Sequence, residues 1–447
     1  MIFFISLIIF FISGYSVLTF LAIFITLHQL FFLSTIVNKQ LPIRNLIGLL
    51  TCIQFLIGPT LLYHGFSPYQ YVYYRMQVPE ITYFLYAIPS VAAFILGLNL
   101  YTNLENEEVN REDILTFINK AKYLPNFLII FGFIFSYLSV HLCQNLKFLF
   151  FLLSNLTWAG VFILVFTKRS LALLIVILIY LIKLKTSIDE SLFHEFFLWT
   201  ILLGCFYCLK YKPLLSHKLL LGATFFILVL FIQSEKYAYR NYINTYKTSS
   251  GFRTFITLSM KDIENHGFFN NNHLAPTISR INQGFIISYL LNNIPKSIAF
   301  EHGKELKNIF ISALIPRIIF PNKINSGNME SFKKYTAGLK YAGENTTMSL
   351  SAFGDAYINF GLVGGSAFMF LLGYFFNCVI QFLAISYKKN LIIFFLMPCI
   401  FFYALFVDSA LETVLGSIVK CLILVCVFML LSKLKILINR GIYKILL

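Results

Sequence analysis

The sequence predicts an all-α polytopic integral membrane protein with 11–12 transmembrane helices and one large extracytoplasmic loop that contains short interfacial helices. Of the 447 residues, 58% are hydrophobic and only 12% are charged, which is more apolar surface than a soluble fold can bury. The mean hydropathy is +0.78. Apolar runs of about 20 residues recur along the chain, the length that crosses a ~30 Å hydrocarbon layer as a helix.

The apolar runs divide the chain into eleven predicted spans, the first of which is one long helix or two short ones. The first 37 residues carry no charge, so we expect a retained anchor and not a cleavable signal, which would begin with basic residues. The predicted spans lie near 4–36, 43–63, 80–101, 123–142, 148–167, 170–184, 195–209, 219–234, 355–385, 391–407 and 415–432.

The positions of the basic residues predict the orientation. Lys and Arg residues lie in the short loops around 39–44, 102–122, 168–169, 210–218 and 388–389 and in the tail after 433. The positive-inside rule places all of these in the cytoplasm, so the net charge of +16 reflects topology and not a nucleic-acid partner.

This orientation divides the chain into three parts. Residues 1–234 form an N-terminal transmembrane bundle of about eight spans, residues 235–353 form a large periplasmic or extracytoplasmic loop, and residues 354–447 form about three C-terminal transmembrane helices with a cytoplasmic tail. Two apolar stretches of the loop, 284–294 and 305–321, are too short to span and are predicted to lie as helices against the membrane. Pro316 and Pro321 interrupt the second stretch.

Three cations of the large loop lie in apolar sequence, which would bury their stems near the headgroup level. Arg280, Arg317 and Lys323 are therefore candidates to bind a lipid-linked diphosphate, because a guanidinium pairs bidentately with phosphate oxygens and an ammonium acts as a point charge. The alternative is nonspecific contact with anionic lipid headgroups.

Four acids lie on the same predicted face. Glu344 and Asp355 are the candidates for proton chemistry, since a carboxylate at an apolar boundary can act as a general base near neutrality. The alternative for Asp355 is an N-cap, because it comes just before a long apolar run. Asp408 and Glu412 lie at the short turn between the last two spans, where they line the same cavity or mark the membrane edge.

No metal site or cofactor is predicted. The loop histidines, among them His302 as a candidate substrate contact, match no metal-ligand spacing. Cys205 and Cys208 form a C-x-x-C on an apolar helix, where small buried hydrophobic residues are the expected interpretation.

Three motifs resemble the O-antigen polymerase (Wzy-type) or oligosaccharide repeat-unit polymerase family of bacterial inner membranes. The motifs are "SRINQG" (279–284), "LIPRIIFPNKIN" (314–325) and "SLSAFGDAYINFGLVGGSAFMFLLG" (349–373). The matching positions are Arg280, Arg317, Pro321, Lys323, Tyr357, Asn359, Phe360 and Gly361, and Asp355 stands where the family often has glutamate.

The resemblance implies a multi-pass inner-membrane glycosyltransferase for lipopolysaccharide and related polysaccharides. Such an enzyme transfers the growing glycan from undecaprenyl diphosphate onto the next lipid-linked repeat unit at the outer face. On this hypothesis Arg280 and Arg317 hold the diphosphate, with Lys323 in support, and Glu344 or Asp355 is the base. Tyr357 and Asn359 would form the rim of the substrate cavity. The implied partners are undecaprenyl diphosphate-linked oligosaccharide, membrane lipid and a chain-length regulator protein.

Two alternatives follow from the same features. An O-antigen ligase shares the lipid-linked donor and the large outer loop but transfers the glycan to lipid A core. A flippase or transporter for the same lipid predicts broken helices and ionisable residues near the bilayer midplane, whereas the polar groups here concentrate outside the spans.

Overall fold

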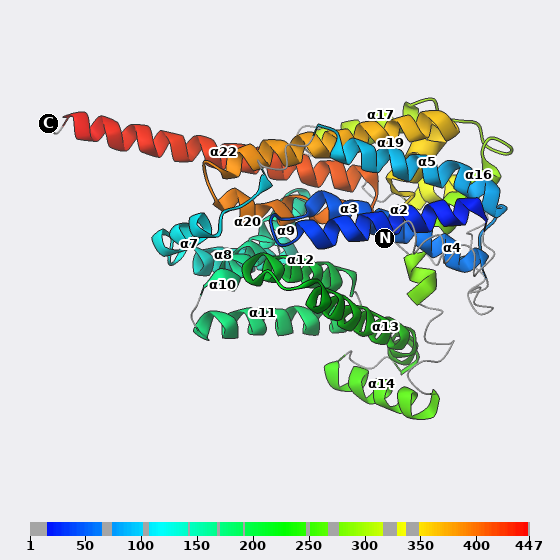
Figure 1. The fold of residues 1–447 in the computed structure, drawn as a ribbon, viewed down its shortest axis with the longest axis horizontal. Coiled ribbons are helices and arrows are strands. Elements are labelled where there is room, and N and C mark those ends of the chain that lie inside the picture. The colour runs from blue at the N-terminus through cyan, green and yellow to red at the C-terminus, as the bar shows by residue number, and fades with distance from the viewer. Residues whose placement is uncertain are drawn as a thin grey trace.

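The computed structural model describes residues 16–64, 74–101, 107–141, 144–167, 170–190, 193–246, 251–266, 277–315, 329–336 and 348–445. All secondary-structure elements among these residues are helices, which confirms the all-α prediction. Figure 1 shows that the long helices lie side by side along the long axis of the molecule. The structure is that of a multi-pass membrane protein.

Eight helices of the described chain are long and apolar enough to cross a membrane, and each coincides with a predicted span. Five of them are single helices: α2 (Val17–Ile36), α5 (Glu80–Asn99), α8 (Leu124–His141), α11 (Ser170–Asp189) and α19 (Ser351–Tyr387). Two are built from consecutive helices: α3, η1 and α4 together (Ile43–Tyr63), and α9 (Gln144–Ser154) with α10 (Leu156–Phe166), whose span is Leu146–Phe166. The last is the Leu215–Gln233 part of α13 (Leu215–Tyr246).

The other three predicted spans are helical as well but are not among these eight. They correspond to α12 (His194–Tyr211), to α20 and α21 (Ile392–Ile400 and Phe402–Leu405), and to α22 (Leu411–Ile445). The break between α20 and α21 falls at Phe401, three residues after Pro398, which cannot donate a helical hydrogen bond. Trp199 of α12 stacks between Trp158 of α10 and Phe402 of α21, so these helices share one aromatic core.

The loops that the charge pattern assigns to one side gather at one end of the bundle. Asn38 Nδ2 donates to Pro213 O at 3.2 Å, Lys218 Nζ to Ser34 O at 2.6 Å, and Gln381 Nε2 to Tyr101 O at 3.1 Å. Helix α7 (Arg111–Lys120) and the C-terminal part of α22 lie at this end, and α4 and α16 lie at the other (Figure 1). The ends of α2, α13 and α19 and the loop residues Pro213 and Tyr101 therefore lie near one another, and the side of the membrane they face stays a prediction.

Arg44 was predicted as a loop charge, but it is 2% exposed in the first turn of α3. Its Nη2 lies 2.6 Å from Glu107 Oε1 and donates to Asn377 Oδ1 of α19 at 3.0 Å. A buried guanidinium needs such a partner because an unpaired charge is costly in a low-dielectric interior. The pair joins α3, α19 and the segment before α7.

Helices α5 and α19 cross closely because each has a glycine at the crossing. A Cβ added at Gly373 would lie 2.2 Å from Phe94 O, and one added at Gly97 would lie 2.2 Å from Phe370 O. Small residues allow this close approach between membrane helices.

The long helix α19 has a kink at Gly361, where φ is +68° and ψ is −157°. Residues without a side chain are almost alone in this region of backbone space. The kink separates the first ten residues of α19, which include Asp355, Tyr357 and Asn359, from the apolar remainder of the helix.

Helix α16 (Gly284–Asn293) corrects a prediction. Its sequence was predicted to lie at the membrane interface, but its residues are almost all buried inside the protein. The π-helical turn η1 (Ile53–Ile57) receives it, since Gln283 N–H donates to Gln54 O at 3.2 Å. A Cβ at Gly284 would lie 2.2 Å from Tyr83 Oη. Its apolar residues Phe285, Ile286, Ile287, Leu290 and Leu291 are all buried, so the helix packs into the protein interior.

Two short helices, α17 (Lys304–Leu314) and α18 (Met329–Tyr335), lie between α16 and α19 in sequence, and α14 (Phe252–His266) precedes them. Helix α17 ends at Leu314, directly before the Ile315–Pro316 step, because the residue before a proline disfavours helical geometry. The helix therefore ends before Pro316, as predicted, while Pro316 and Pro321 themselves lie outside the described residues.

Candidate functional site

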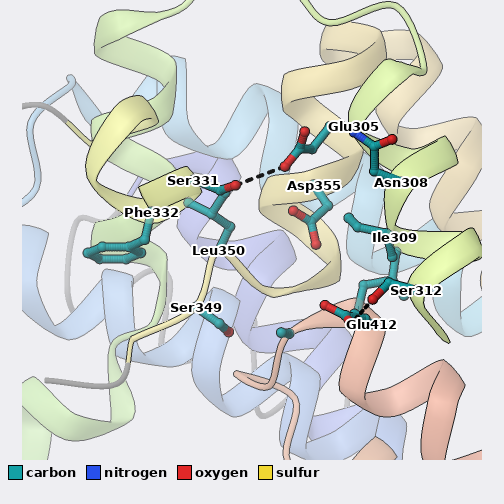
Figure 2. Close-up of a pocket in the computed structure, with 12 residues that line it drawn as sticks. Glu305, Asn308, Ile309, Ser312, Ser331, Phe332, Ser349, Leu350, Asp355 and Glu412 are labelled. Atoms are coloured by element: carbon teal, nitrogen blue, oxygen red, sulfur yellow. Dashed lines mark hydrogen bonds between the residues drawn. The ribbon is translucent and has the colours of Figure 1, made fainter. Parts of the chain in front are cut away.

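A cavity lies where α17, α18, the start of α19 and the start of α22 meet (Figure 2). Seven of the twelve described lining residues carry carboxylate, amide or hydroxyl groups, and the other five are apolar. The described lining residues are Glu305, Asn308, Ile309, Ser312, Ser331, Phe332, Ser349, Leu350, Asp355, Ala410, Leu411 and Glu412. A concave site with a few convergent polar groups is the usual form of a small-ligand site.

Asp355 lies at the centre of this lining, between Glu305 and Glu412 (Figure 2). The residue is 6% exposed and belongs to the second turn of α19, whose N-cap is Leu350. Asp355 therefore does not cap its own helix, which was one of the two predicted roles. Its carboxylate accepts a hydrogen bond from the backbone N–H of Leu411, the first residue of α22, and has Glu305 and Glu412 as electrostatic neighbours.

A serine holds each of the two flanking glutamates. Ser331 Oγ of α18 donates to Glu305 Oε1 at 2.9 Å, and Ser312 Oγ of α17 donates to Glu412 Oε1. Both serines line the cavity themselves. These hydrogen bonds fix the orientation of the carboxylates, and they tie α18 to α17 and α17 to α22.

Arg280 lies just outside the cavity wall, 46% exposed by side chain. Its Nη2 is 3.9 Å from Oδ2 of Asp408, and the Asp408 backbone carbonyl accepts a hydrogen bond from Ser349 Oγ at 2.5 Å. The other carboxylate oxygen of Asp408, Oδ1, is buried and has no hydrogen-bond partner. Arg280, Asp408 and the cavity residue Ser349 thus form a continuous chain of contacts, while Glu412 is part of the lining itself.

The other predicted site residues either lie away from the cavity lining or fall outside the described residues. Tyr357 and Asn359 are buried with protein partners: Tyr357 Oη donates to Ile294 O at 3.0 Å, and Asn359 Nδ2 to Asp355 O at 2.8 Å. His302 is exposed, with φ of +47°, in the turn before α17. None of the three is among the residues that line the cavity. Arg317, Lys323 and Glu344 lie outside the described residues.

Hydrogen bonds of Glu301 and Asn293 with Lys334 and Tyr335 hold α18 beside the cavity, and we call these four residues the α18 latch. Glu301 accepts hydrogen bonds from Lys334 Nζ and from Tyr335 Oη, both at 2.6 Å, and Asn293 Nδ2 donates to Tyr335 O at 3.0 Å. The hydrogen bond from Lys334 holds the pKa of Glu301 below its usual range. The carboxylate is therefore ionised at neutral pH, and the latch weakens only as the pH falls through this lowered pKa.

Ser351, the first residue of α19, has φ of +62°, a conformation that residues with side chains seldom adopt. It is buried, and its hydroxyl has no hydrogen-bond partner among the described residues. Backbone strain and an unpaired buried hydroxyl both lie at the entry to the helix that carries Asp355. Such features gather at functional sites more often than elsewhere.

Sequence reasoning missed Glu305, Asn308, Ser312, Ser331 and Ser349. Glu305 and Asn308 stand on an amphipathic helix, where polar residues are expected on any solvent-facing side, and the three serines carry no pattern of their own. Their grouping depends on how α17, α18 and α22 pack. The sequence did indicate Glu412, because it lies at the short turn between the last two predicted spans.

A second polar cluster lies between α2, α4 and α5. Glu80 accepts hydrogen bonds from Ser16 and from Thr19 Oγ1, the latter at 2.6 Å, and His64 Nε2 is 3.7 Å from Glu80 Oε2. The side chains of Ser16, Thr19, His64 and Glu80 thus make polar contacts with one another. Among the described residues no group of three or more His, Cys, Asp or Glu side chains has the geometry of a metal site.

Comparison with known proteins identifies a family but not an activity. The profile of a family described as a domain of unknown function (DUF8712) matches residues 3–439, nearly the whole chain. No curated protein and no solved structure matches the chain.

Proposed function

We propose that this chain, which belongs to the DUF8712 family, is a membrane-embedded glycosyltransferase. In this proposal it is a polysaccharide polymerase that transfers a growing glycan from undecaprenyl diphosphate onto the next lipid-linked repeat unit. The reaction takes place at the outer face of a bacterial inner membrane. The observation that carries the proposal is the position of Asp355, a buried carboxylate that faces a polar cavity at one end of the bundle.

The reaction needs one base and one group that stabilises the leaving diphosphate. The hydroxyl oxygen of the acceptor sugar attacks the anomeric carbon of the donor glycan, and the bond from that carbon to the diphosphate oxygen breaks. Asp355 takes the hydroxyl proton as the glycosidic bond forms. Undecaprenyl diphosphate leaves with the electron pair of the broken bond, so the step balances without a metal or a redox partner.

In this proposal the acceptor sugar binds in the cavity, and the basic residues bind the diphosphate of the donor. The carboxyl groups of Glu305, Asp355 and Glu412 can accept hydrogen bonds from sugar hydroxyls, so the proposal places the acceptor sugar in the cavity. Arg280 lies outside the wall, joined to it through Asp408 and Ser349, where it faces the diphosphate of the donor. Arg317 and Lys323 are proposed to complete the diphosphate site, with Glu344 as the alternative base.

The arrangement of loops supports an outer location for this cavity. The short basic loops gather at the opposite end of the bundle, which the positive-inside rule assigns to the cytoplasm. The chain-length regulator implied by the family resemblance would contact the outer end or the lipid-facing helices. No surface of the described chain singles out either one.

Reconstitution tests the function directly. The purified protein in liposomes, supplied with undecaprenyl diphosphate-linked repeat units, is expected to produce a ladder of two or more joined units and to release undecaprenyl diphosphate. A ligase would leave these units unjoined until lipid A core is added. A flippase would move the units across the bilayer without forming a new glycosidic bond, and that result would overturn the proposal.

A further inference from the structure

Glu301 lies in the turn before α17 and has hydrogen bonds to three of the helices that line the cavity. Its backbone N–H donates to Ile358 O of α19 at 3.0 Å, and its carbonyl accepts from the N–H of Lys304, the first residue of α17, at 3.0 Å. Its carboxylate accepts from Lys334 Nζ and Tyr335 Oη of α18, both at 2.6 Å. One residue therefore links α17 and α18 to the helix that carries the proposed base.

The backbone contact of Glu301 falls beside the kink of α19. Ile358 lies three residues before Gly361, where φ of +68° departs from helical geometry. The ring of Phe300 packs against this glycine, since a Cβ added at Gly361 would lie 3.3 Å from Phe300 Cζ. The turn before α17 is therefore seated on the kink by backbone and ring contacts, which do not involve the Glu301 carboxylate.

The carboxylate of Glu301 holds α18 chiefly through Tyr335. Tyr335 is 0% exposed, and the one hydrogen of its hydroxyl is donated to Glu301. Loss of the carboxylate would leave this buried donor without its acceptor, which is unfavourable. The ion pair with Lys334 contributes less, because the Lys334 side chain is 55% exposed.

Helix α18 supplies one wall of the cavity (Figure 2). Ser331 and Phe332 line the cavity, and Ser331 Oγ donates to Glu305 of α17 at 2.9 Å. Asp355 is held separately, since its carboxyl group accepts a hydrogen bond from the backbone of Leu411 in α22. A displacement of α18 would therefore change the shape of the cavity and leave the proposed base in place.

Resting on the proposed function, we propose that Glu301 is a positioning residue for the acceptor sugar. It acts through Tyr335, whose hydrogen bond holds α18 so that Ser331 and Phe332 complete the wall of the acceptor site. Groups that position a substrate contribute to a reaction by holding the reactants in the productive geometry. Glu301 thus affects the binding of the acceptor and not the proton transfer to Asp355.

The acceptor KM tests this role. Glu301→Ala is expected to raise the acceptor KM about fivefold or more and to change kcat by less than about twofold, since saturating acceptor refills the site. A residue that only stabilised the fold would instead lower kcat through a smaller folded fraction and leave the acceptor KM unchanged. Glu301→Gln keeps an oxygen that can accept from Tyr335, so its acceptor KM should stay within about twofold of wild type.

Two neighbouring lysines of α18 offer a matched control. Lys333 and Lys334 are both exposed, and Lys334 is the one that donates to Glu301. Lys333→Ala should leave the acceptor KM unchanged. Lys334→Ala combined with Glu301→Ala should give the acceptor KM of Glu301→Ala alone, because both changes break the same contact. Independent, multiplying increases in the acceptor KM would contradict the shared role.

Thiol labelling tests the hold of Glu301 on α18 without any glycan transfer. Thr336 follows α18 directly and is 1% exposed. Thr336→Cys places a thiol there in a chain whose Cys143, Cys378 and Cys426 are changed to serine. A maleimide reagent is expected to label this thiol about tenfold faster after Glu301→Ala than with Glu301 intact, because local opening exposes it.

The control for labelling is Glu264→Ala on α14, which removes an exposed glutamate outside the lining and should leave the rate unchanged. Equal labelling rates with and without Glu301 would overturn the positioning role, as would an unchanged acceptor KM in Glu301→Ala. Faster labelling together with a wild type that transfers no glycan would overturn the proposed function and the acceptor role, while the hold of Glu301 on α18 would be confirmed.

Discussion

In the proposed reaction Asp355 is the base and Arg280 binds the diphosphate. Asp355 is buried in a cavity with two other carboxylates, whereas Arg280 is half-exposed and has one distant ion-pair partner, Asp408, at 3.9 Å. A surface pair of this kind contributes little to stability, about 0–1 kcal/mol. Arg280 is therefore well placed to exchange Asp408 for a phosphate group.

Arg280→Ala is expected to slow glycan transfer about 10²-fold, since the loss of one group that stabilises developing charge has an effect of this size. The melting temperature should change little because the ion pair is exposed and long. The matched control is Lys296→Ala, an exposed cation of the same loop region, for which transfer should stay at the wild-type rate. An Arg280→Ala enzyme with the wild-type rate would remove the diphosphate role.

The sequence predicted the elements better than their environment. The span near 43–63 was predicted with the bounds that the structure gives, because a long apolar run admits few other states. The burial of α16 was not predicted, since an apolar segment of ten residues fits a membrane surface and a protein interior equally well. The site residues Glu305 and Glu412 come from helices far apart in sequence, and only packing brings them beside Asp355.

The α5–α19 crossing gives a prediction at the scale of elements. Gly373→Ala is expected to lower the free energy of unfolding by about 1–3 kcal/mol, because the added Cβ would overlap the Phe94 carbonyl and force the helices apart. Gly204→Ala on α12 is the control: nothing lies within 4 Å of its Cβ position, so stability should hold or rise slightly. The measurement is thermal unfolding in detergent, and equal melting temperatures for the two variants would contradict the close crossing.

The threading of the whole molecule separates two ends of different character. One end carries the short basic loops and the buried Arg44–Glu107 pair, and the other carries the cavity and the α18 latch. Arg44 of this pair also donates to Asn377 and so joins α3 to α19 at the first end, while the proposed chemistry lies at the second. The Arg44 contacts and the cavity thus lie at opposite ends of α19.

This arrangement predicts the accessibility of single cysteines. In a chain whose exposed Cys378 and Cys426 are replaced by serine, Lys307→Cys on α17 should react with a membrane-impermeant maleimide in intact spheroplasts. Lys120→Cys on α7 should react only after the membrane is permeabilised. Labelling in the reverse order would invert the topology and place the cavity in the cytoplasm, where flipped repeat units are not present.

The rate of glycosidic-bond formation by Asp355→Asn, measured in the reconstituted system against wild type, tests the central claim most directly. Asparagine keeps the shape of the side chain but cannot take a proton, so transfer should fall about 10²–10⁴-fold while the folded protein is retained. Asp355→Glu, which restores the carboxylate, should recover part of the rate. A folded Asp355→Asn protein that joins repeat units at the wild-type rate would contradict the account.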